Sequence, residues 1–242
     1  MVPSSRLKHV SLVTASLAVA VPLAGLALTG GAPSAAAAVR HAQRLTPATT
    51  AACPKSGGIP FAGSLSNGIV KLGSSVSGSG VTGKVCGILK VASSGFSVSI
   101  PKANISFAPT HVTILGLASL PATIAAAGKG TGRVTAGPKG TFNTKISVPV
   151  TSTVSALGFQ CTVGPFTPVL TTGTSGSVRG KALSGTLSKL QGKLAAGEFS
   201  VPAVQASATC PFLVAGLVNT LAGFPLKAGQ STLTASTTLS VG

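Results

Sequence analysis

Leu-Thr-Ala-Ser-Thr-Thr-Leu-Ser-Val, residues 233–241, is the stretch that decides the fold class of this chain. In an extended segment, its apolar side chains point to one face and its hydroxyl side chains to the other. The apolar set is Leu233, Ala235, Leu239 and Val241, and the polar set is Thr234, Ser236, Thr238 and Ser240. A period of two residues is typical of a half-buried strand, so the stretch predicts a β-strand.

The same texture recurs along the chain, and turn-forming residues divide it into short pieces. A similar alternation runs through Val81, Val85, Leu89 and Val91. The 242 residues include 31 Gly and 16 Pro, and Asn67-Gly68 is a turn signal. Many short strands between turns predict an all-β fold, and we expect an antiparallel β-sandwich, immunoglobulin-like or related.

One short segment has helical spacing instead. Pro211 suits a first helical position, and Gly223 marks an end. Between them lies an apolar stripe formed by Leu213, Val214, Leu217, Val218 and Leu221. This stripe predicts one short helix near residues 211–222. A second helical spacing, at Leu183, Leu187, Leu190 and Leu194, is interrupted by glycines, so strand and loop are expected there.

The chain contains a weak internal similarity. Apolar positions in residues 98–105 have counterparts 101 residues later, in residues 199–206, and both copies shift their alternation at a Pro. A strand that bends, or ends and restarts, would produce this shift. The turn-forming residues 136–140 would then separate a β-rich half at 53–139 from a second half at 140–242 that contains the helix. Chance similarity in a sequence of few residue types is the alternative.

The first 52 residues precede these halves. A basic start, an uncharged stretch and a run of Ala predict a secretory signal peptide over residues 1–38, cut within residues 35–38. A membrane anchor is one alternative, and a lipoprotein attached through Cys53 is another. Residues 39–52 are polar and rich in Ala and Thr, and we expect a flexible arm there.

The four Cys predict two disulfides, because an exported chain meets oxidising conditions. Three pairings are open, and two bonds within the proposed halves are favoured. These are Cys53 with Cys86, and Cys161 with Cys210. Zinc binding is the alternative, although the spacings are wide and no CxxC pair occurs.

Only one side chain, Glu198, can carry a negative charge at neutral pH, against 18 Lys and Arg. Most mechanisms near neutrality need carboxylates as bases, nucleophiles or metal ligands, so we expect no catalytic residue, metal site or cofactor. Residues 78–84 fit the GxGxxG pattern but lack the acidic partner of a nucleotide site, so a glycine-rich turn is expected. His111 has no Asp to orient it. A hydrolase that uses Ser and Lys stays open.

The positive charge predicts attraction to polyanions. The cations are dispersed along the chain, and the closest group is Arg179, Lys181, Lys189 and Lys193. We take this group as the candidate contact for an anionic surface. The hypothesis is a secreted or envelope-associated, non-enzymatic protein held near anionic envelope polymers or lipid headgroups.

Other partners follow from the aromatic and apolar content. The chain has no Trp or Tyr, so no specific nucleic-acid surface is expected, and core positions are expected for its nine Phe. A second hypothesis is a carrier of a lipid or other apolar ligand, with residues 114–120 and 212–224 lining a cavity between β layers. The oligomeric state is not predicted.

One resemblance covers mainly residues 145–242. It rests on the export signal, a β texture rich in Ser, Thr, Gly and Ala, and a run of motifs. The run is Cys161, Cys210, Pro211, an apolar helix with Asn219, and Gly223-Phe224-Pro225. Together these features resemble secreted β-rich proteins of unknown function from high-GC Gram-positive bacteria. The resemblance brings no catalytic residues to this chain.

Overall fold

The computed structural model describes residues 53–115 and 118–242, and most of them lie in β-strands. The predicted signal peptide at residues 1–38 and the predicted arm at 39–52 lie outside these residues. The strands are β1 (Ile59–Leu72), β2 (Val76–Ala92), β3 (Gly95–Ile100), β4 (Ile105–Phe107), β5 (Thr110–Ile114), β6 (Ala118–Ala126), β7 (Gly130–Ala136), β8 (Phe142–Ser147), β9 (Val150–Ala156), β10 (Phe159–Phe166), β11 (Val169–Thr171), β12 (Thr174–Ser175), β13 (Val178–Arg179), β14 (Lys181–Thr186), β15 (Lys189–Ala196) and β16 (Ser231–Val241). The remaining described elements are the helix α1 (Phe212–Ala222) and the short 3-10 turns η1 (Lys102–Asn104) and η2 (Pro138–Gly140). The predicted all-β class with one short helix is confirmed.

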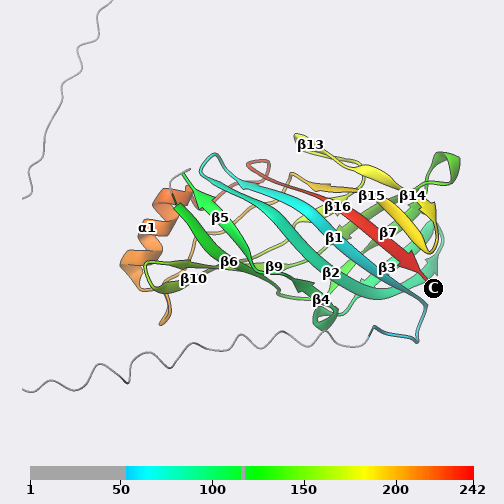
Figure 1. Ribbon diagram of the computed structural model, residues 1–242, viewed down its shortest axis with the longest axis horizontal. Helices are drawn as coiled ribbons and strands as arrows, with labels where there is room; N and C mark the ends of the chain where they lie inside the picture. Colours follow the sequence, from blue (N-terminus) through cyan, green and yellow to red (C-terminus); the bar gives the residue numbers. More distant parts are fainter. Residues whose placement is uncertain (1–52, 116–117) are drawn as a thin grey trace, which may run out of the picture. The chain divides into compact units, whose positions relative to one another are not determined.

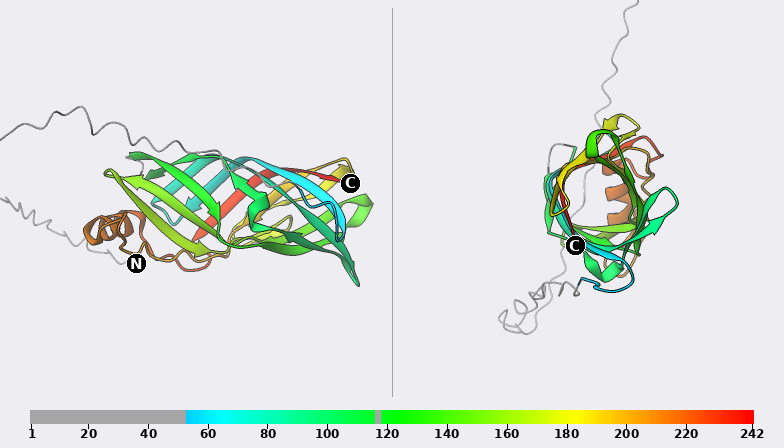
Figure 2. Two further views of the ribbon diagram at one scale, coloured as in Figure 1. Left: turned by 90° about the horizontal axis from the view of Figure 1, so that it is seen from below. Right: turned by 90° about the vertical axis from the view of Figure 1, so that its right-hand side faces the viewer.

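The main sheet closes into a barrel. Its order is β1, β16, β15, β11, β8, β7, β3 and β2, and β1 also pairs with β2 to complete the ring of eight. All of these pairings are antiparallel. Figure 2 shows the ring end-on. The expected sandwich of two open sheets is corrected to a closed barrel, because β1 forms ladders on both of its edges.

Each side of the predicted boundary supplies four adjacent places in this ring. β1, β2, β3 and β7 come from residues 53–139, and β8, β11, β15 and β16 from residues 140–242. The boundary turn contains η2 and joins β7 to β8. Both parts of the chain therefore share one barrel wall and one interior.

One place in the ring is filled by two strands in succession. β11 lies between β8 and β15, paired to β15 through Thr171. Further along, β14 fills the same place, with Leu183 opposite Phe142 of β8 and Lys181 opposite Lys193 of β15. The small β12–β13 hairpin comes between β11 and β14 in the chain. The segment around Leu183, Leu187, Leu190 and Leu194 is thus strand, as predicted.

At one end the barrel continues into a wider sheet. The first part of β2 pairs with β5, and the order runs on through β6, β9 and β10. Residues 199–226, which include α1, pack on this extension, and Phe199, Val201 and Val218 join its core. In Figure 1 α1 lies at the end opposite the C-terminus, with the end of β5 and the β9–β10 turn beside it.

Both favoured disulfides are present. Cys53–Cys86 links the segment before β1 to β2, with Cα atoms 5.5 Å apart. Cys161–Cys210 ties β10 to the segment before α1, with Cα atoms 4.9 Å apart. No cysteine is free among the described residues, which include all four, so no thiolate is left for zinc.

The barrel interior is packed with side chains. Phe61, Val98, Ile100 and Val134 belong to its core, and each is at most 7% exposed. Gly132 of β7 faces the next strand so closely that an added Cβ would overlap the backbone carbonyl of Lys145. Glycine at this position allows the close approach of β7 and β8.

The buried face of α1 differs from the predicted apolar stripe. The helix begins after Pro211 and ends at Gly223, whose φ of 73° is left-handed. Its buried residues are Ala215, Val218 and Ala222. Those left exposed include Phe212, Leu213, Leu217 and Leu221. Small residues bring the helix close to the sheet, and its large apolar side chains then point outward. Phe159 is also 39% exposed, so the expected core position is wrong for it and for Phe212.

Two further expectations, both about turn-forming residues, are corrected. Asn67-Gly68 lies inside β1, where the register to β16 shifts and Asn67 has a φ of 50°. Residues 78–84 lie inside β2 and do not form a turn before it. Residues 98–105 form the end of β3, η1 and the start of β4, whereas Val201 in their supposed counterpart forms an isolated bridge to Leu226. Turn-forming residues here bend long strands, and the two similar segments differ in structure.

Removal of the Cys161–Cys210 bond should destabilise the protein and loosen one region. Replacing both residues by Ala should lower the free energy of unfolding by about 3 to 4 kcal/mol, because the bond restricts the unfolded chain. Urea unfolding measures this loss. Hydrogen exchange should rise most in residues 199–226, which the bond holds to β10. The Cys53→Ala/Cys86→Ala variant is the control, and an equal rise in both variants would contradict the local effect.

Two glycine substitutions should have opposite effects on stability. Gly132→Ala should cost about 1 to 3 kcal/mol, because the new methyl group meets the backbone of β8. Gly216→Ala should stabilise by up to about 1 kcal/mol, because this glycine is helical and nothing lies within 4 Å of its Cβ position. Thermal and urea unfolding measure both changes. If Gly132→Ala does not lower stability, β7 and β8 do not approach each other as closely as the structure shows.

Candidate functional site

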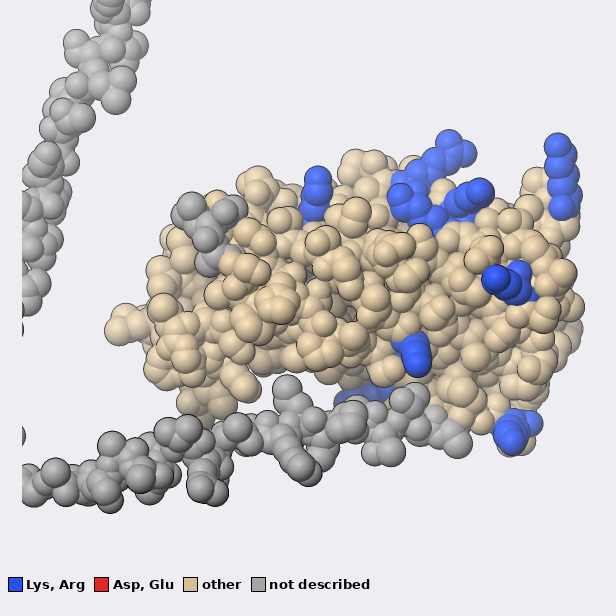
Figure 3. All heavy atoms as spheres, viewed as in Figure 1, with Lys and Arg blue, Asp and Glu red and all other residues tan. Residues whose placement is uncertain are grey.

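Positive charge is concentrated on one part of the fold. The cations outside the described residues are Arg6, Lys8, Arg40 and Arg44, so 14 of the 18 Lys and Arg lie within them. None falls in residues 103–128, 146–178 or 194–226, which contain β4–β6, β9, β10 and α1. In Figure 3 the Lys and Arg atoms lie over the barrel, and the end that carries α1 shows none in this view. Lys and Arg are dispersed along the sequence, but the fold gathers them on the barrel and leaves the end with α1 without them.

The four cations selected from the sequence lie on the described strands near one another. Arg179 ends β13, Lys181 begins β14, and Lys189 and Lys193 belong to β15. Lys181 and Lys193 are direct cross-strand partners. Lys189 shares the outer face of β15 with Lys193, because residues four apart in a strand point the same way. All four side chains are exposed.

A second pair of cations, which the sequence analysis missed, lies on the neighbouring strands. Arg133 of β7 and Lys145 of β8 are direct cross-strand partners, and both are exposed. β8 in turn neighbours β14 through Leu183 and Phe142. The sequence held a signal for this pair, because Arg133 and Lys145 are equidistant from Lys139 in the turn between the strands. A symmetric hairpin about that turn pairs them.

We call the outer surface of β7, β8, β14 and β15 the cationic face. Its basic residues are Arg133, Lys145, Lys181, Lys189 and Lys193. Like charges directly opposite each other in a sheet are destabilising by about 0.2 to 1 kcal/mol. The single acidic side chain of the protein, Glu198, cannot neutralise five cations. An anion bound across the pairs would relieve this repulsion.

A trough on the cationic face lies beside Arg133 and Lys145. Its volume is about 620 Å³. The polar side chains along it are Thr131, Thr135, Asn143, Ser147 and Thr171. Nη1 of Arg133 donates to Oγ of Ser94 at 2.9 Å, which orients the guanidinium and leaves its other N–H groups for a ligand. Charged nitrogens next to hydroxyl and amide groups suit phosphate or carboxylate oxygens.

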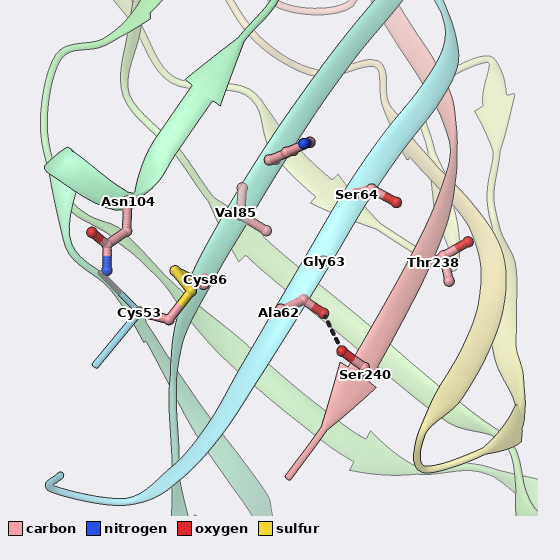
Figure 4. A pocket seen from close by; sticks show the side chains of 10 residues that line it. Cys53, Ala62, Gly63, Ser64, Val85, Cys86, Asn104, Thr238 and Ser240 are labelled. Carbon is pink, nitrogen blue, oxygen red and sulfur yellow. Dashed lines mark hydrogen bonds between the residues drawn. A yellow bond between two sulfur atoms is a disulfide. The ribbon is translucent and has the colours of Figure 1, made fainter. Parts of the chain in front are cut away.

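A second hollow lies on the outer face of β1, β2 and β16 and has a volume of about 310 Å³. Figure 4 shows the Cys53–Cys86 disulfide and Asn104 at one side of it, and Thr238 and Ser240 at the other. Oγ of Ser240 donates to the backbone oxygen of Ala62 at 3.4 Å. Lys84 is the one cation along this hollow. It therefore offers an anion less than the cationic face does.

The described residues with candidate chemical roles, His111 and Glu198, lie in different hollows of the structure. No group of three His, Cys, Asp or Glu among them could hold a metal ion. His111 lies exposed on β5, in a hollow with Ser77 and Ser119. Glu198 lines a different hollow, with Phe199. The hydrolase that uses Ser and Lys stays a prediction.

The barrel encloses a cavity of about 50 Å³. Phe107, Ile146 and Leu183 line it, together with Thr144, whose buried Oγ1 has no hydrogen-bond partner among the described residues. Typical sites for small organic ligands are about 300 to 1,000 Å³. The cavity is therefore too small for a lipid chain, and α1 turns its large side chains away from the interior. None of the described residues among 114–120 and 212–224 lines this cavity, and the carrier hypothesis stays a prediction.

Comparisons with known proteins do not assign a family. No protein-family model, curated protein or solved structure matches this chain. The resemblance to secreted proteins of high-GC Gram-positive bacteria therefore stays a prediction. Within the described part of the chain, no helix has the length and apolar character needed to cross a membrane.

Removing one cation of the Arg133–Lys145 pair should stabilise the fold. Lys145→Gln should raise the free energy of unfolding by about 0.2 to 1 kcal/mol at low salt, because it removes a like-charge contact. The gain should shrink as salt screens the repulsion. Urea unfolding at low and high ionic strength measures it. Lys139→Gln, in the turn, is the control and should change the free energy of unfolding less. An equal gain in both variants would mean that the lower net charge of the protein, and not the loss of the pair, stabilises the fold.

Proposed function

We propose that this chain is a non-enzymatic protein of the extracellular space or cell envelope that binds anionic polymers through its cationic face. The observation that carries the proposal is the pairing of Arg133 with Lys145 and of Lys181 with Lys193 on one barrel wall. Each pair costs stability in the unbound protein. A role in binding anions explains why the sequence has both like-charge pairs despite their cost in stability.

The proposed location rests on the disulfides and the leader. Two disulfides are typical of proteins in oxidising compartments outside the cytoplasm. The first 38 residues have the pattern of a secretory signal. In a bacterial envelope, phosphate- and carboxylate-bearing polymers are the abundant anions that such a protein would meet.

The geometry of the cationic face suits a polymer better than a single small anion. Neighbouring strands lie about 4.8 Å apart, so cations on β7, β8, β14 and β15 form a row across a rigid wall. Arg133 can hold two oxygens of one group through its fork, and the lysines act as point charges for further groups. Hydroxyl and amide side chains of the trough donate additional hydrogen bonds. Repeated anionic groups along a flexible chain would fill the row.

Nucleic acid is not favoured as this polymer. Single-stranded nucleic-acid surfaces combine a basic groove with aromatic side chains on which bases stack. The chain has no Trp or Tyr, and the residues along the trough include no Phe. The face therefore supplies contacts to anionic groups but no platform for bases.

The proposal predicts tight, salt-sensitive binding of a phosphate polymer that depends on the cationic face. Arg133→Gln/Lys145→Gln/Lys181→Gln/Lys193→Gln should weaken binding to long-chain polyphosphate by about tenfold or more, since each charged contact contributes on the order of 1 kcal/mol. Isothermal titration calorimetry across a salt series measures the affinity. Binding to isolated cell walls tests the natural polymer, and binding to polyglutamate tests polymers that carry carboxylates.

The matched control removes the same charge elsewhere. Lys55→Gln/Lys71→Gln/Lys102→Gln/Lys227→Gln changes four exposed or loop positions away from the cationic face. This variant should keep most of the affinity. Equal weakening in both variants would sink the proposed site and leave only the diffuse field of the whole protein. Absence of binding even at low ionic strength would sink the function itself.

A further inference from the structure

The end of the fold that carries no Lys or Arg carries most of the exposed large apolar side chains among the described residues. Of the eleven large hydrophobic residues that are exposed within residues 53–115 and 118–242, seven lie there. They are Leu115, Leu157, Phe159, Phe212, Leu213, Leu217 and Leu221. We call this set the apolar end. Soluble proteins rarely expose a contiguous apolar patch of this kind, and such patches mark contact with a protein or a membrane.

Two members of the apolar end occupy unfavourable backbone positions. Leu115 follows β5, Leu157 follows β9, and each has a φ of 52°. This left-handed region favours Gly or Asn and costs other residues roughly 1 to 2 kcal/mol. Leu157 is nevertheless 71% exposed and Leu115 47% exposed, so burial does not repay the cost. An external apolar partner gives a reason for leucine at both positions.

Contacts in the fold place these two leucines beside the ends of α1. The backbone N–H of Gln160 donates to the oxygen of Thr209, and the Cys161–Cys210 bond joins the same two segments. These contacts bring the β9–β10 turn next to the start of α1. At the other end of the helix, the N–H of Leu115 donates to Ser75 at 2.6 Å. A Cβ on Gly223 would lie 3.9 Å from Oγ of that same serine.

The helix itself has an outer face without charge. Its exposed positions are Phe212, Leu213, Gly216, Leu217, Thr220 and Leu221. A solvent-facing helix normally carries charged and polar residues on this side. Helices that lie at a membrane interface bury such an apolar face among the acyl chains. The apolar end thus consists of the outer side of α1 and of the exposed residues Leu115, after β5, and Leu157, after β9.

Two described cations, Lys71 and Lys227, lie at the border of this end. Lys71 and Lys227 are exposed. Lys71 is two residues from Gly73, whose N–H donates to the oxygen of Gln230, and the side chain of Gln230 accepts from the N–H of Lys227. These contacts place Lys71, near the end of β1, and Lys227, in the connection before β16, at the border of the apolar end. If the apolar side chains enter the acyl chains of a bilayer, the two lysines beside them lie at the level of the anionic headgroups.

We propose that the apolar end docks on the surface of an anionic lipid bilayer. Leu115, Leu157 and the outer side of α1 enter the boundary between headgroups and acyl chains, and Lys71 and Lys227 contact headgroup phosphates. A second copy of the chain fits this end less well, because a two-fold contact would also bring the bordering lysines of both copies together. This inference does not rest on the proposed polymer binding, since it uses another surface.

Vesicle flotation tests the docking. The protein is collected after export, and its intact mass shows whether the predicted signal peptide has been removed. The protein should float with vesicles of phosphatidylglycerol and phosphatidylcholine and bind pure phosphatidylcholine more weakly. Leu115→Asn/Leu157→Asn/Leu217→Gln should weaken vesicle binding by about tenfold or more, because it removes buried apolar area. The fold should survive, because Asn tolerates a positive φ and Leu217 is exposed. Thermal unfolding should show no loss of stability.

The matched control changes exposed apolar residues on the barrel, away from this end. Ile59→Thr/Val91→Thr/Leu187→Gln removes a similar apolar area and should leave vesicle binding unchanged. The four-residue variant of the cationic face should also still bind vesicles, and the apolar-end variant should still bind polyphosphate. These two results separate lipid docking from polymer binding.

Three results would overturn the docking. The first is that the wild-type protein does not float with anionic vesicles. Undiminished flotation of the apolar-end variant is the second, and it would assign any lipid attraction to the cationic face. The third is absence of vesicle binding together with self-association that the same variant abolishes in sedimentation, which would make this end an interface between copies.

Discussion

The pairing of β1 with both β16 and β2 is the constraint on which the rest of the structure depends. Ala62 lies opposite Ser240 on one side and Cys86 on the other, so the first and last strands of the described fold join edge to edge. A closed ring leaves its eight strands without free edges within the barrel. It also fixes one inner and one outer face for every strand, and long curved strands are needed to reach around. Gly68 at the bend of β1 and Gly132 on β7 allow backbones to approach where a side chain would obstruct them.

Closure separates two kinds of surface. Strands of the ring turn their Lys and Arg outward, because the interior is filled by apolar side chains. The segments inserted between ring strands, β4–β6 after β3 and β9–β10 after β8, carry no Lys or Arg and form the extension on which α1 packs. The result is a cationic wall and an apolar end without Lys or Arg on one folded unit. A protein with both surfaces could stand between an anionic polymer and a lipid surface.

Several elements were predictable because their signals are local. The alternation in residues 233–241 gave β16, and Pro211 with Gly223 marked both ends of α1. The disulfides followed from their position within each half of the chain. Asn67-Gly68 failed as a turn, because a left-handed residue serves a bulge within a strand as well as it serves a hairpin. The buried face of α1 failed as well, because hydrophobicity alone does not show that small residues face the sheet.

The sequence by itself determined the all-β class, the short helix near residues 211–222 and the scarcity of carboxylates, and it favoured the disulfide pairing that is present, since composition and short-range periodicity carry these properties. Tertiary structure alone decided that the sheet closes, because sandwich and barrel strands share the same two-residue alternation. It also decided which cations are neighbours. Arg133 meets Lys145, and Lys181 meets Lys193, only through strand register, which depends on where turns and bulges fall. The sorting of charge from exposed apolar surface likewise appears only when distant, cation-free segments gather at one end of the barrel.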